Sequence, residues 1–424
     1  MRKTVLLGIV LLATLCIAPV VSGVTVSDVS ARQRWPWNGL IDVDFTIGDA
    51  AAGDIFRVEV AAAYAGGTKR VTGRTYLGEP LFGRGANRVT WDFGADCPDL
   101  KAADLQVAAT VAPVNADAVD VYMVIDLSSG PSSTRYPVRY TFTAPELVPT
   151  NDLVACAADP NRTTKLWLKR VKENTFPFRG TDSSNGVGWF NARLTPYYIG
   201  LFEVTQKQWA LVMDTWPSRF TNVTYRAARP VERVNYIDVI GHNNWPNDKT
   251  VAADSFVGRV RARTGLTTFN LPTEAQWECA CRAGYTRSIN PGIKYATNVR
   301  CKSLVGTHTY DYNEDLTYGT GAVGMYAANA WGFYDFYGNV MEMCLDAFGS
   351  ETTLKELYEG QDPVTDPIGP PTNATARYHA TRGGAYYNSD SYCTNYQRDY
   401  GNRSETGTRD GGIGLRVAVS PEWE

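Results

Sequence analysis

Histidine is scarce in this sequence: 424 residues contain only three, at positions 242, 308 and 379. These positions are far apart, so no pair of histidines has the short spacing that holds zinc or non-haem iron. A phosphate-binding loop, a dinucleotide-binding fingerprint and a G-x-S-x-G nucleophile elbow are also missing. These absences argue against histidine-based metal enzymes, nucleotide-dependent enzymes and hydrolases built on that elbow.

Long apolar runs and a basic surplus are missing as well. Beyond the N-terminus no segment approaches the roughly 18 consecutive apolar residues of a membrane-spanning helix. The formal net charge is -3, and acidic and basic residues are mixed along the chain. We therefore expect neither a membrane span nor a nucleic-acid partner, because nucleic-acid binding requires a basic face.

The N-terminus has the pattern of a signal peptide. Met1-Arg2-Lys3 precedes an apolar stretch from Val5 to Val21, and Val21-Ser22-Gly23 has the small residues of a signal-peptidase site. We expect residues 1–23 to be removed by cleavage near Gly23. The mature protein is then secreted or periplasmic.

Removal of residues 1–23 leaves an odd number of cysteines. An odd number leaves at least one thiol unpaired within the chain, and the usual role of such a thiol is that of a small buried apolar residue. Cys279 and Cys281 are two residues apart on a predicted helix, so their side chains point apart and cannot pair. The disulfide pairing stays open for the set as a whole, which is Cys97, Cys156, Cys279, Cys281, Cys301, Cys344 and Cys393.

Residues 24–145 have a period-two pattern typical of half-buried strands. Apolar residues alternate with polar ones in Ile41–Ile47, Phe56–Val60 and Val89–Phe93, and Gly66-Gly67 separates two such runs as a hairpin turn. About seven strands without helical periodicity predict an all-β sandwich of the immunoglobulin or fibronectin type. This part has no histidine and no cluster of acids, which indicates a spacer or docking module.

A change of character follows the predicted sandwich. Residues 146–163 break the alternation and are predicted to be a linker. In residues 164–424, Thr205 and Thr273 each begin a capping box, and Gly284 is the expected C-cap of the second helix. Long stretches rich in Gly, Asn, Tyr and Trp have little periodicity. The chain as a whole is therefore expected to be α+β, with few regular elements in its C-terminal domain.

Six motifs in this C-terminal part occur in a characteristic order. They are YYIGLFEVTQKQW (197–209), RPVERV (229–234), FNLPTEAQWECACRAG (269–284), WGFYDFYGNVMEM (331–343), RGGAYYNSDSYCTNYQ (382–397) and GIGLRVA (412–418). In this order they resemble the formylglycine-generating, sulfatase-modifying factor family. The resemblance implies a decorated C-type-lectin-like domain with low regular secondary structure.

The resemblance also implies a reaction that this sequence supports only in part. Members of the family oxidise a sulfatase cysteine to formylglycine, using molecular oxygen and a Cu(I) ion held by two cysteines five residues apart. The matching positions here are Cys393 and Asn388. An amide oxygen is a hard, neutral ligand and does not replace a thiolate for Cu(I). Cys393 is thus the candidate catalytic residue, and Cu(I) is expected only if the family activity is retained. Further departures from the family pattern are Ala385, Asn395, Met341 and Met343.

Calcium is the second ion that the resemblance implies. Ca²⁺ binds six to eight hard oxygens, which two carboxylates and several carbonyls can supply. The positions that match the family's ligands are Asp335, Phe336, Gly338, Val340 and Glu342, and a second site would begin at Asn298 and Val299 with further ligands at Asp311 or Asp315. The ordinary alternative for Asp335 and Glu342 is hydrogen bonding to loop amides.

Three hypotheses about function follow. The first is an active formylglycine-generating oxidase, against which the Asn388 substitution argues. The second, which we favour, is an exported module without copper oxidation that binds a protein, peptide or glycan ligand outside the cytoplasm. The third is a family enzyme with different chemistry, in which Asp390, Arg382 or Arg416 would serve the pocket.

Overall fold

The computed structural model describes residues 24–420, apart from residues 35–38, 99, 101–103, 115–118, 149–151, 180–187, 243, 296–298, 302–318, 372–377 and 401–410. The expected signal peptide therefore lies outside the described residues. The chain folds into two compact units. The first includes the chain up to Val124 and Val138–Ala144, and the second includes Ile125–Pro137 and the chain from Pro145 onward.

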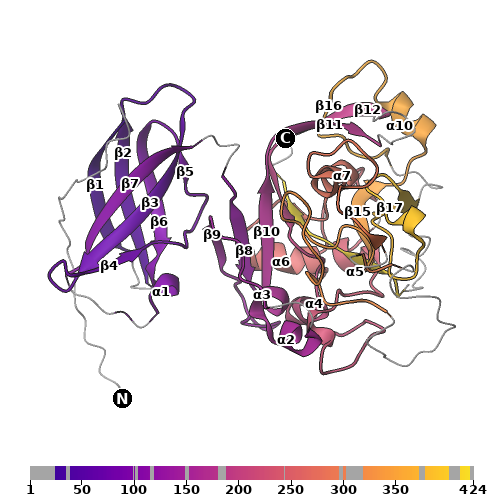
Figure 1. Cartoon of the computed structure of the whole chain (residues 1–424), viewed down its shortest axis with the longest axis horizontal. Helices are drawn as coiled ribbons and strands as arrows, with labels where there is room; N and C mark the ends of the chain where they lie inside the picture. Colours follow the sequence, from indigo (N-terminus) through magenta and orange to yellow (C-terminus); the bar gives the residue numbers. More distant parts are fainter. Residues whose placement is uncertain are drawn as a thin grey trace. The chain divides into compact units, whose positions relative to one another are not determined.

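The first unit contains two antiparallel sheets around one apolar core (Figure 1). The strand order is β1-β2-β6 in one sheet and β4-β3-β5 in the other, where β7 also pairs with β3. Val43, Phe45, Val58 and Trp91 are fully buried between the sheets, as the period-two pattern predicts. The elements are β1 (Thr25–Gln33), β2 (Leu40–Gly48), β3 (Ile55–Tyr64), β4 (Lys69–Thr72), β5 (Leu81–Phe82), β6 (Gly85–Asp92), α1 (Phe93–Asp96), β7 (Gln106–Val114) and β9 (Val138–Thr141). The boundary between the two units falls within β8 (Tyr122–Asp126).

The hairpin predicted at Gly66-Gly67 is present. Strands β3 and β4 pair with Tyr64 opposite Lys69, and the turn between them has positive φ at Ala65, Gly66 and Gly67. Glycine adopts this left-handed backbone without a steric penalty. The turn chemistry in the sequence therefore identified the hairpin.

The second unit begins earlier in the chain than the predicted linker. Within Ile125–Pro137, the Leu127 amide donates to the Thr164 carbonyl (2.8 Å) and the Tyr136 hydroxyl donates to the Leu211 carbonyl (2.7 Å). Residues 146–163, predicted to be a linker, include two short helices, α2 (Leu153–Ala158) and α3 (Pro160–Thr163). The side chain of Arg162 is fully buried and donates to the Val323 carbonyl (2.9 Å). This segment is thus an integral part of the second unit.

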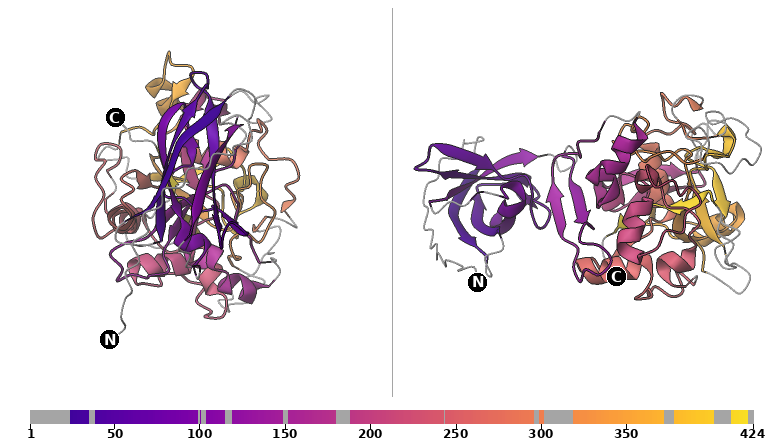
Figure 2. Two further views of the ribbon diagram at one scale, coloured as in Figure 1. Left: turned by 90° about the vertical axis from the view of Figure 1, so that its left-hand side faces the viewer. Right: turned by 90° about the horizontal axis from the view of Figure 1, so that it is seen from below.

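The second unit is built from small sheets joined by long irregular segments (Figure 2). Its strand orders are β14-β20-β13-β10, β18-β17-β15-β19 and β11-β12-β16. Most of these strands have five residues or fewer, so side-chain interactions must stabilise much of the backbone. The strands are β10 (Lys165–Val171), β11 (Asn174–Phe178), β12 (Phe190–Leu194), β13 (Tyr197–Gly200), β14 (Phe269–Asn270), β15 (Met341–Ala347), β16 (Val364–Thr365), β17 (His379–Arg382), β18 (Arg398–Tyr400), β19 (Ile413–Leu415) and β20 (Ala418–Val419).

The two predicted capping boxes are both present. Thr205 caps α4 (Gln206–Met213) and Thr273 caps α7 (Glu274–Arg282), each with the reciprocal glutamine contact. The C-cap of α7 is Ala283, with φ of 48°, and not Gly284, which follows it with φ of 86°. The other helices of this unit are η2 (Arg226–Ala228), α5 (Tyr236–Ile240), α6 (Phe256–Thr264), α10 (Glu351–Leu357) and η3 (Asp390–Tyr392).

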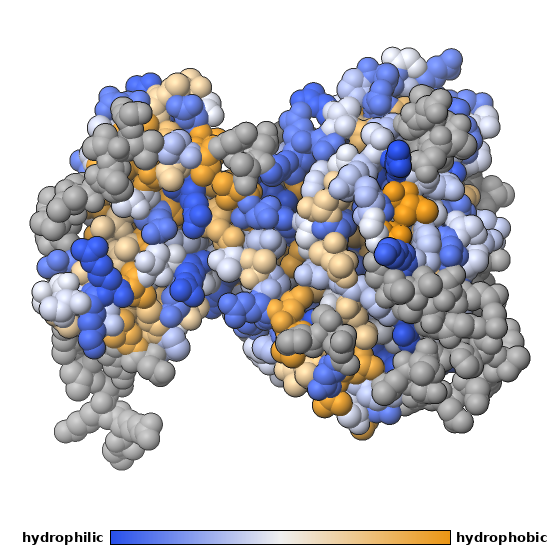
Figure 3. Space-filling view, viewed as in Figure 1, coloured by the Kyte–Doolittle hydropathy of each residue, from blue (hydrophilic) through white to orange (hydrophobic). Residues whose placement is uncertain are grey.

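The architecture is therefore a mixed fold with several sheets and few helices. In the part of the chain that the structure describes, no helix is long and apolar enough to cross a membrane. Figure 3 shows hydrophilic and hydrophobic residues interspersed over the visible face.

Candidate functional site

Asn388 closes a tight turn at the position of the missing cysteine. Its side-chain oxygen accepts a hydrogen bond from the Ala385 amide (2.8 Å), and its own amide donates to the Ala385 carbonyl (2.9 Å). An Asn side chain that bonds to nearby backbone in this way is a common turn device. The amide oxygen of Asn388 thus has a local structural partner, and it does not provide the soft ligand that Cu(I) requires.

Cys393 lies five residues further on and is fully buried. Its sulfur lies so close to Gly384 that a Cβ at that glycine would be 2.6 Å from Sγ, and Gly384 has φ of 72°. Glycine is therefore required there by both space and backbone conformation. This accounts for the second glycine of the R-G-G motif as a packing partner of the Cys393 thiol.

A second thiol, that of Cys301, lies beside Cys393. The two side chains are hydrogen-bonded, and this bond, burial and the Asp390 carboxylate together raise the pKa of the Cys393 thiol. The Cys301 thiol also donates to Asp390 Oδ1 (3.5 Å). The Cys393 thiol is therefore held in the neutral form that burial favours. The sequence analysis did not single out Cys301, because it is 92 positions from Cys393 and belongs to none of the six motifs.

Glu342 forms a buried ion pair with Arg416. The guanidinium donates through Nη2 to Glu342 Oε1 (2.7 Å) and through Nε to Oε2 (2.8 Å), and Oε2 also accepts from Trp277 Nε1 (2.7 Å). Both side chains are fully buried. Arg416 thus has a structural partner and is not exposed to a substrate.

Two further acids lie around this ion pair, Glu203, which is buried, and Asp335, which is half-buried. Glu203 accepts from the Asn339 side chain (2.6 Å) and from a backbone amide (3.1 Å), and Asp335 accepts from another backbone amide (2.6 Å). Burial raises the pKa of Asp335 to about 6, and burial together with the charges of Asp335 and Glu342 raises the pKa of Glu203 well above its ordinary value. The positive charge of Arg416 therefore acts on three acidic side chains, those of Glu342, Glu203 and Asp335. The sequence analysis missed Glu203, although an acid inside the apolar run of the first motif is a usable signal.

The remaining residues of the first expected calcium site form the adjoining turn. Phe336 and Val340 are buried, and Gly338 donates its amide to the Gly383 carbonyl (2.8 Å). A Cβ at Gly338 would lie 2.4 Å from the Arg300 carbonyl oxygen, so this position requires glycine. The turn and the acids Asp335 and Glu342 are thus brought together.

The second expected calcium site cannot be assembled from the described residues. Val299 is buried and its carbonyl accepts from the Cys301 amide (2.9 Å), while Asn298, Asp311 and Asp315 lie outside the described residues. Among the residues that the structure describes, no group of three or more His, Cys, Asp or Glu side chains is placed to hold one metal ion.

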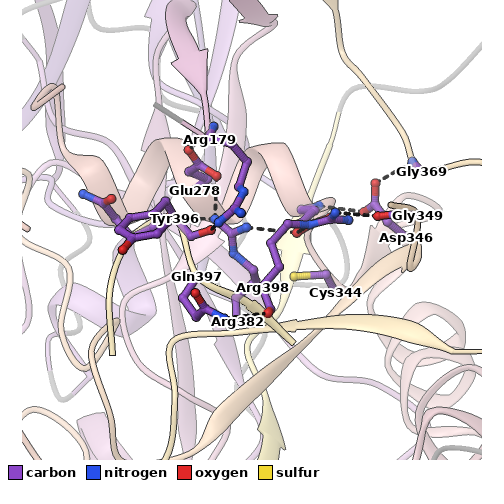
Figure 4. A network of polar contacts seen from close by, with 12 residues as sticks. Arg179, Glu278, Cys344, Asp346, Gly349, Gly369, Arg382, Tyr396, Gln397 and Arg398 are labelled. Carbon is purple, nitrogen blue, oxygen red and sulfur yellow. Dashed lines mark hydrogen bonds and ion pairs between the residues drawn. The ribbon is translucent and has the colours of Figure 1, made fainter. Parts of the chain in front are cut away.

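Another network of buried charges joins α7 to β17 and β18 (Figure 4). Arg382 donates to Glu274 (2.9 Å) and to Glu278 (2.5 Å), and Arg398 donates through Nη2 to Glu274 (2.7 Å). Nearby, burial and the charge of Arg382 lower the pKa of Arg179 to about 10. Arg382 therefore stabilises the packing of the domain. This argues against the third hypothesis, in which Arg382 would serve the pocket.

The two cysteines of α7 have separate neighbours, as predicted from their spacing. The Cys279 side chain is hydrogen-bonded to Tyr197 and the Cys281 side chain to Tyr337. Both thiols are buried, so neither lies at an exposed edge of the helix.

Comparison with known proteins gives the family of this domain. The family model described as the sulfatase-modifying factor enzyme 1-like domain matches residues 174–421. Chaperone protein LppX of Paenibacillus barcinonensis is 32% identical over 219 residues, which are 45% of this chain and 75% of that protein. The formylglycine-generating enzyme of Thermomonospora curvata is 31% identical over 183 residues, which are 42% of this chain and 51% of that enzyme. The corresponding enzyme of Streptomyces coelicolor is 27% identical over 205 residues, which are 47% of this chain and 55% of that enzyme.

Two solved structures are also similar. Treponema denticola variable protein 1 has a TM-score of 0.45 at 24% identity, covering 61% of this chain and 96% of that one. PvdO from Pseudomonas aeruginosa has a TM-score of 0.44 at 19% identity, covering 60% of this chain and 95% of that one. The chain spans about half the length of the formylglycine-generating enzymes, so the family match concerns a domain. That match covers more than half of the chain, and the protein belongs to the sulfatase-modifying factor enzyme 1-like family.

Proposed function

We propose that this protein is an exported accessory or binding module that does not carry out the family's copper-dependent oxidation. The observation that carries the proposal is the turn at Asn388, whose side chain bonds to the Ala385 amide where the parent enzymes have a copper cysteine. Cu(I) requires soft ligands, and this amide is not one. A shared fold does not by itself transfer a reaction.

The proposed partner is a protein, peptide or glycan outside the cytoplasm. The similarity to a protein named as a chaperone supports an accessory role, because that relative shares the domain at 32% identity. In this proposal the second unit is C-type-lectin-like and binds through its long loops, while the first unit is an immunoglobulin-like spacer. Loops on a rigid scaffold are a common place for recognition.

The proposal predicts that the purified chain does not form formylglycine. The full chain, supplied with Cu(I) and oxygen, would be incubated with a peptide carrying the Cys-x-Pro-x-Arg motif that the family modifies, and product followed by mass spectrometry. We expect no product above the peptide-only sample, for the parent and for Asn388→Cys, because the pocket has changed at several positions. The Thermomonospora curvata enzyme is the positive control. Copper-dependent product from the parent chain would contradict the proposal.

We also propose that the protein binds calcium, because acidic side chains gather at the expected site. Glu342 is already neutralised by Arg416, which leaves the buried Glu203 and the half-buried Asp335 as acids beside the turn at Gly338. A divalent cation held by Asp335, with Glu203 and carbonyls of the turn, would offset this charge. We expect the thermal unfolding temperature to fall when calcium is removed with a chelator and to recover on adding Ca²⁺ but not Mg²⁺. An unfolding temperature that does not respond to calcium would remove this part of the proposal.

A further inference from the structure

Cys301 and Cys393 lie far apart in the sequence, and Tyr295 and Asp390 each form hydrogen bonds with both of them. Tyr295 accepts from the Cys301 thiol through its carbonyl (3.8 Å) and donates from its hydroxyl to the Cys393 carbonyl (2.8 Å). Asp390 accepts from the Cys301 thiol through Oδ1 (3.5 Å) and from the Cys393 amide through its carbonyl (3.0 Å). With the contact between the two side chains themselves, these bonds fix both sulfurs in one small, buried site.

We propose that Cys301 and Cys393 are a redox pair that closes to an intramolecular disulfide. Cys393 then has a partner other than the cysteine that the family places five residues before it. Cys301 also gains a role. The pair links the chain at Cys301 to the turn between Gly384 and Cys393.

No other pair of described cysteines has this arrangement. Cys279 and Cys281 each contact a tyrosine, and the Cys344 thiol donates to the Glu342 carbonyl (3.9 Å). Cys156 packs in a small apolar cluster with Ala228 and Ala322. The Cys301–Cys393 pair is thus the one for which the structure gives a direct contact between two cysteine side chains.

The charge of the site favours a disulfide over an ion held by two thiolates. Two thiolates beside the Asp390 carboxylate would place three negative charges in a buried region, and a monovalent cation would offset only one of them. A disulfide is neutral and carries no such penalty. No third side chain among the described His, Cys, Asp and Glu residues completes a metal site there.

The reaction requires a two-electron oxidant, for which a small-molecule disulfide such as oxidised glutathione is the suitable class. During folding, while the two thiols are still accessible, one of them loses its proton and the resulting thiolate attacks a glutathione sulfur. This breaks the S–S bond and releases one glutathione thiolate, which takes up the proton. The other protein thiol, once deprotonated, attacks the mixed disulfide and releases the second glutathione. The two protein thiols are oxidised, and one glutathione disulfide is reduced to two thiols.

Disulfide mapping on the full chain tests the proposal. The protein would be refolded with oxidised glutathione, denatured, alkylated and digested, and the peptides identified by mass spectrometry before and after reduction. We expect the peptides of Cys301 and Cys393 to be linked, while Cys97, Cys156, Cys279, Cys281 and Cys344 are alkylated. Because the link closes a loop of 92 positions, the oxidised protein should unfold roughly 5–10 °C above the reduced protein.

Two variants complete the test. In Cys301→Ser, Cys393 should become alkylatable and the redox-dependent shift in unfolding temperature should disappear, while Cys97→Ser, in the first unit, should retain both the link and the shift. Alkylation of both Cys301 and Cys393 after oxidation, or a link from either to another cysteine, would overturn the proposal. Mapping of the unmodified chain decides this even if Cys301→Ser fails to fold. The mapping is also independent of the formylglycine assay, so the two proposals can fail separately.

Discussion

Arg416→Met is expected to lower the free energy of unfolding of the second unit by about 3–5 kcal/mol. The guanidinium binds both oxygens of Glu342 and also donates to the carbonyls of Gly200 (2.9 Å) and Tyr334 (2.8 Å). Methionine fills a similar volume but leaves Glu342 buried without its cation. Glu203 and Asp335 also lose the positive charge of Arg416, which favours their ionised forms. We therefore expect these carboxyl groups to take up protons more readily in the variant.

Urea unfolding followed by tryptophan fluorescence measures this effect. The matched control is Lys355→Met, which removes the exposed pair of Lys355 with Glu351 (2.7 Å) and should change the free energy of unfolding by less than about 1 kcal/mol. The double variant Arg416→Met with Glu342→Gln should recover part of the loss, because no unpaired charge then remains at that position. A loss below about 1 kcal/mol in Arg416→Met would show that the ion pair does not stabilise the domain.

Local patterns predicted much of the secondary structure. The alternation at Ile41–Ile47 became β2, the glycine pair at Gly66-Gly67 became a hairpin turn, and Thr205 and Thr273 became N-caps. Each of these features depends on neighbours within a few positions, which is the range that periodicity and capping rules address. The boundary near residue 145 was harder to place, because β8 runs into Ile125–Pro137, where the Leu127 amide bonds to Thr164 of the second unit.

The chemistry of the candidate site could be predicted only where a motif carried it. The positions of Cys393 and Asn388 could be predicted because both lie in the motif that begins with R-G-G. Cys301 was not, since only the tertiary fold brings it to Cys393. Glu203 was missed for a similar reason, because its partners Asn339 and Val340 lie in another motif. Long-range pairs between irregular segments leave no local period in a single sequence.

Glu232→Gln is expected to make the stability of the protein less sensitive to a rise in pH from acidic to neutral values. The Glu232 side chain is fully buried, and its Oε1 accepts from the amides of Arg219 (2.6 Å) and Phe220 (3.3 Å). Its Oε2 is buried and has no hydrogen-bond partner among the described residues. Burial raises the pKa of Glu232 from 4.5 to about 7.

The sign of the effect follows from this raised pKa. Below pH 4.5 the carboxyl is protonated in both the folded and the unfolded chain, so it does not make stability depend on pH. Between pH 4.5 and about 7 the unfolded chain ionises first, and stability falls as pH rises. Above this range the carboxylate is charged in both states. For a pKa shift of this size, its burial then lowers the free energy of unfolding by about 3 kcal/mol.

Glutamine does not titrate, so the variant lacks this pH-dependent loss. We expect the free energy of unfolding of Glu232→Gln, relative to the parent, to become more favourable by about 2–3 kcal/mol between roughly pH 5 and pH 8. Comparing the two pH values separates this change from any constant effect of placing an amide beside Phe220. Glu356→Gln, on the exposed face of α10, is the control and should show no such change with pH. A parallel pH dependence in Glu232→Gln and the parent would mean that Glu232 is already ionised in the folded protein at neutral pH, with a cation or a further hydrogen bond at Oε2.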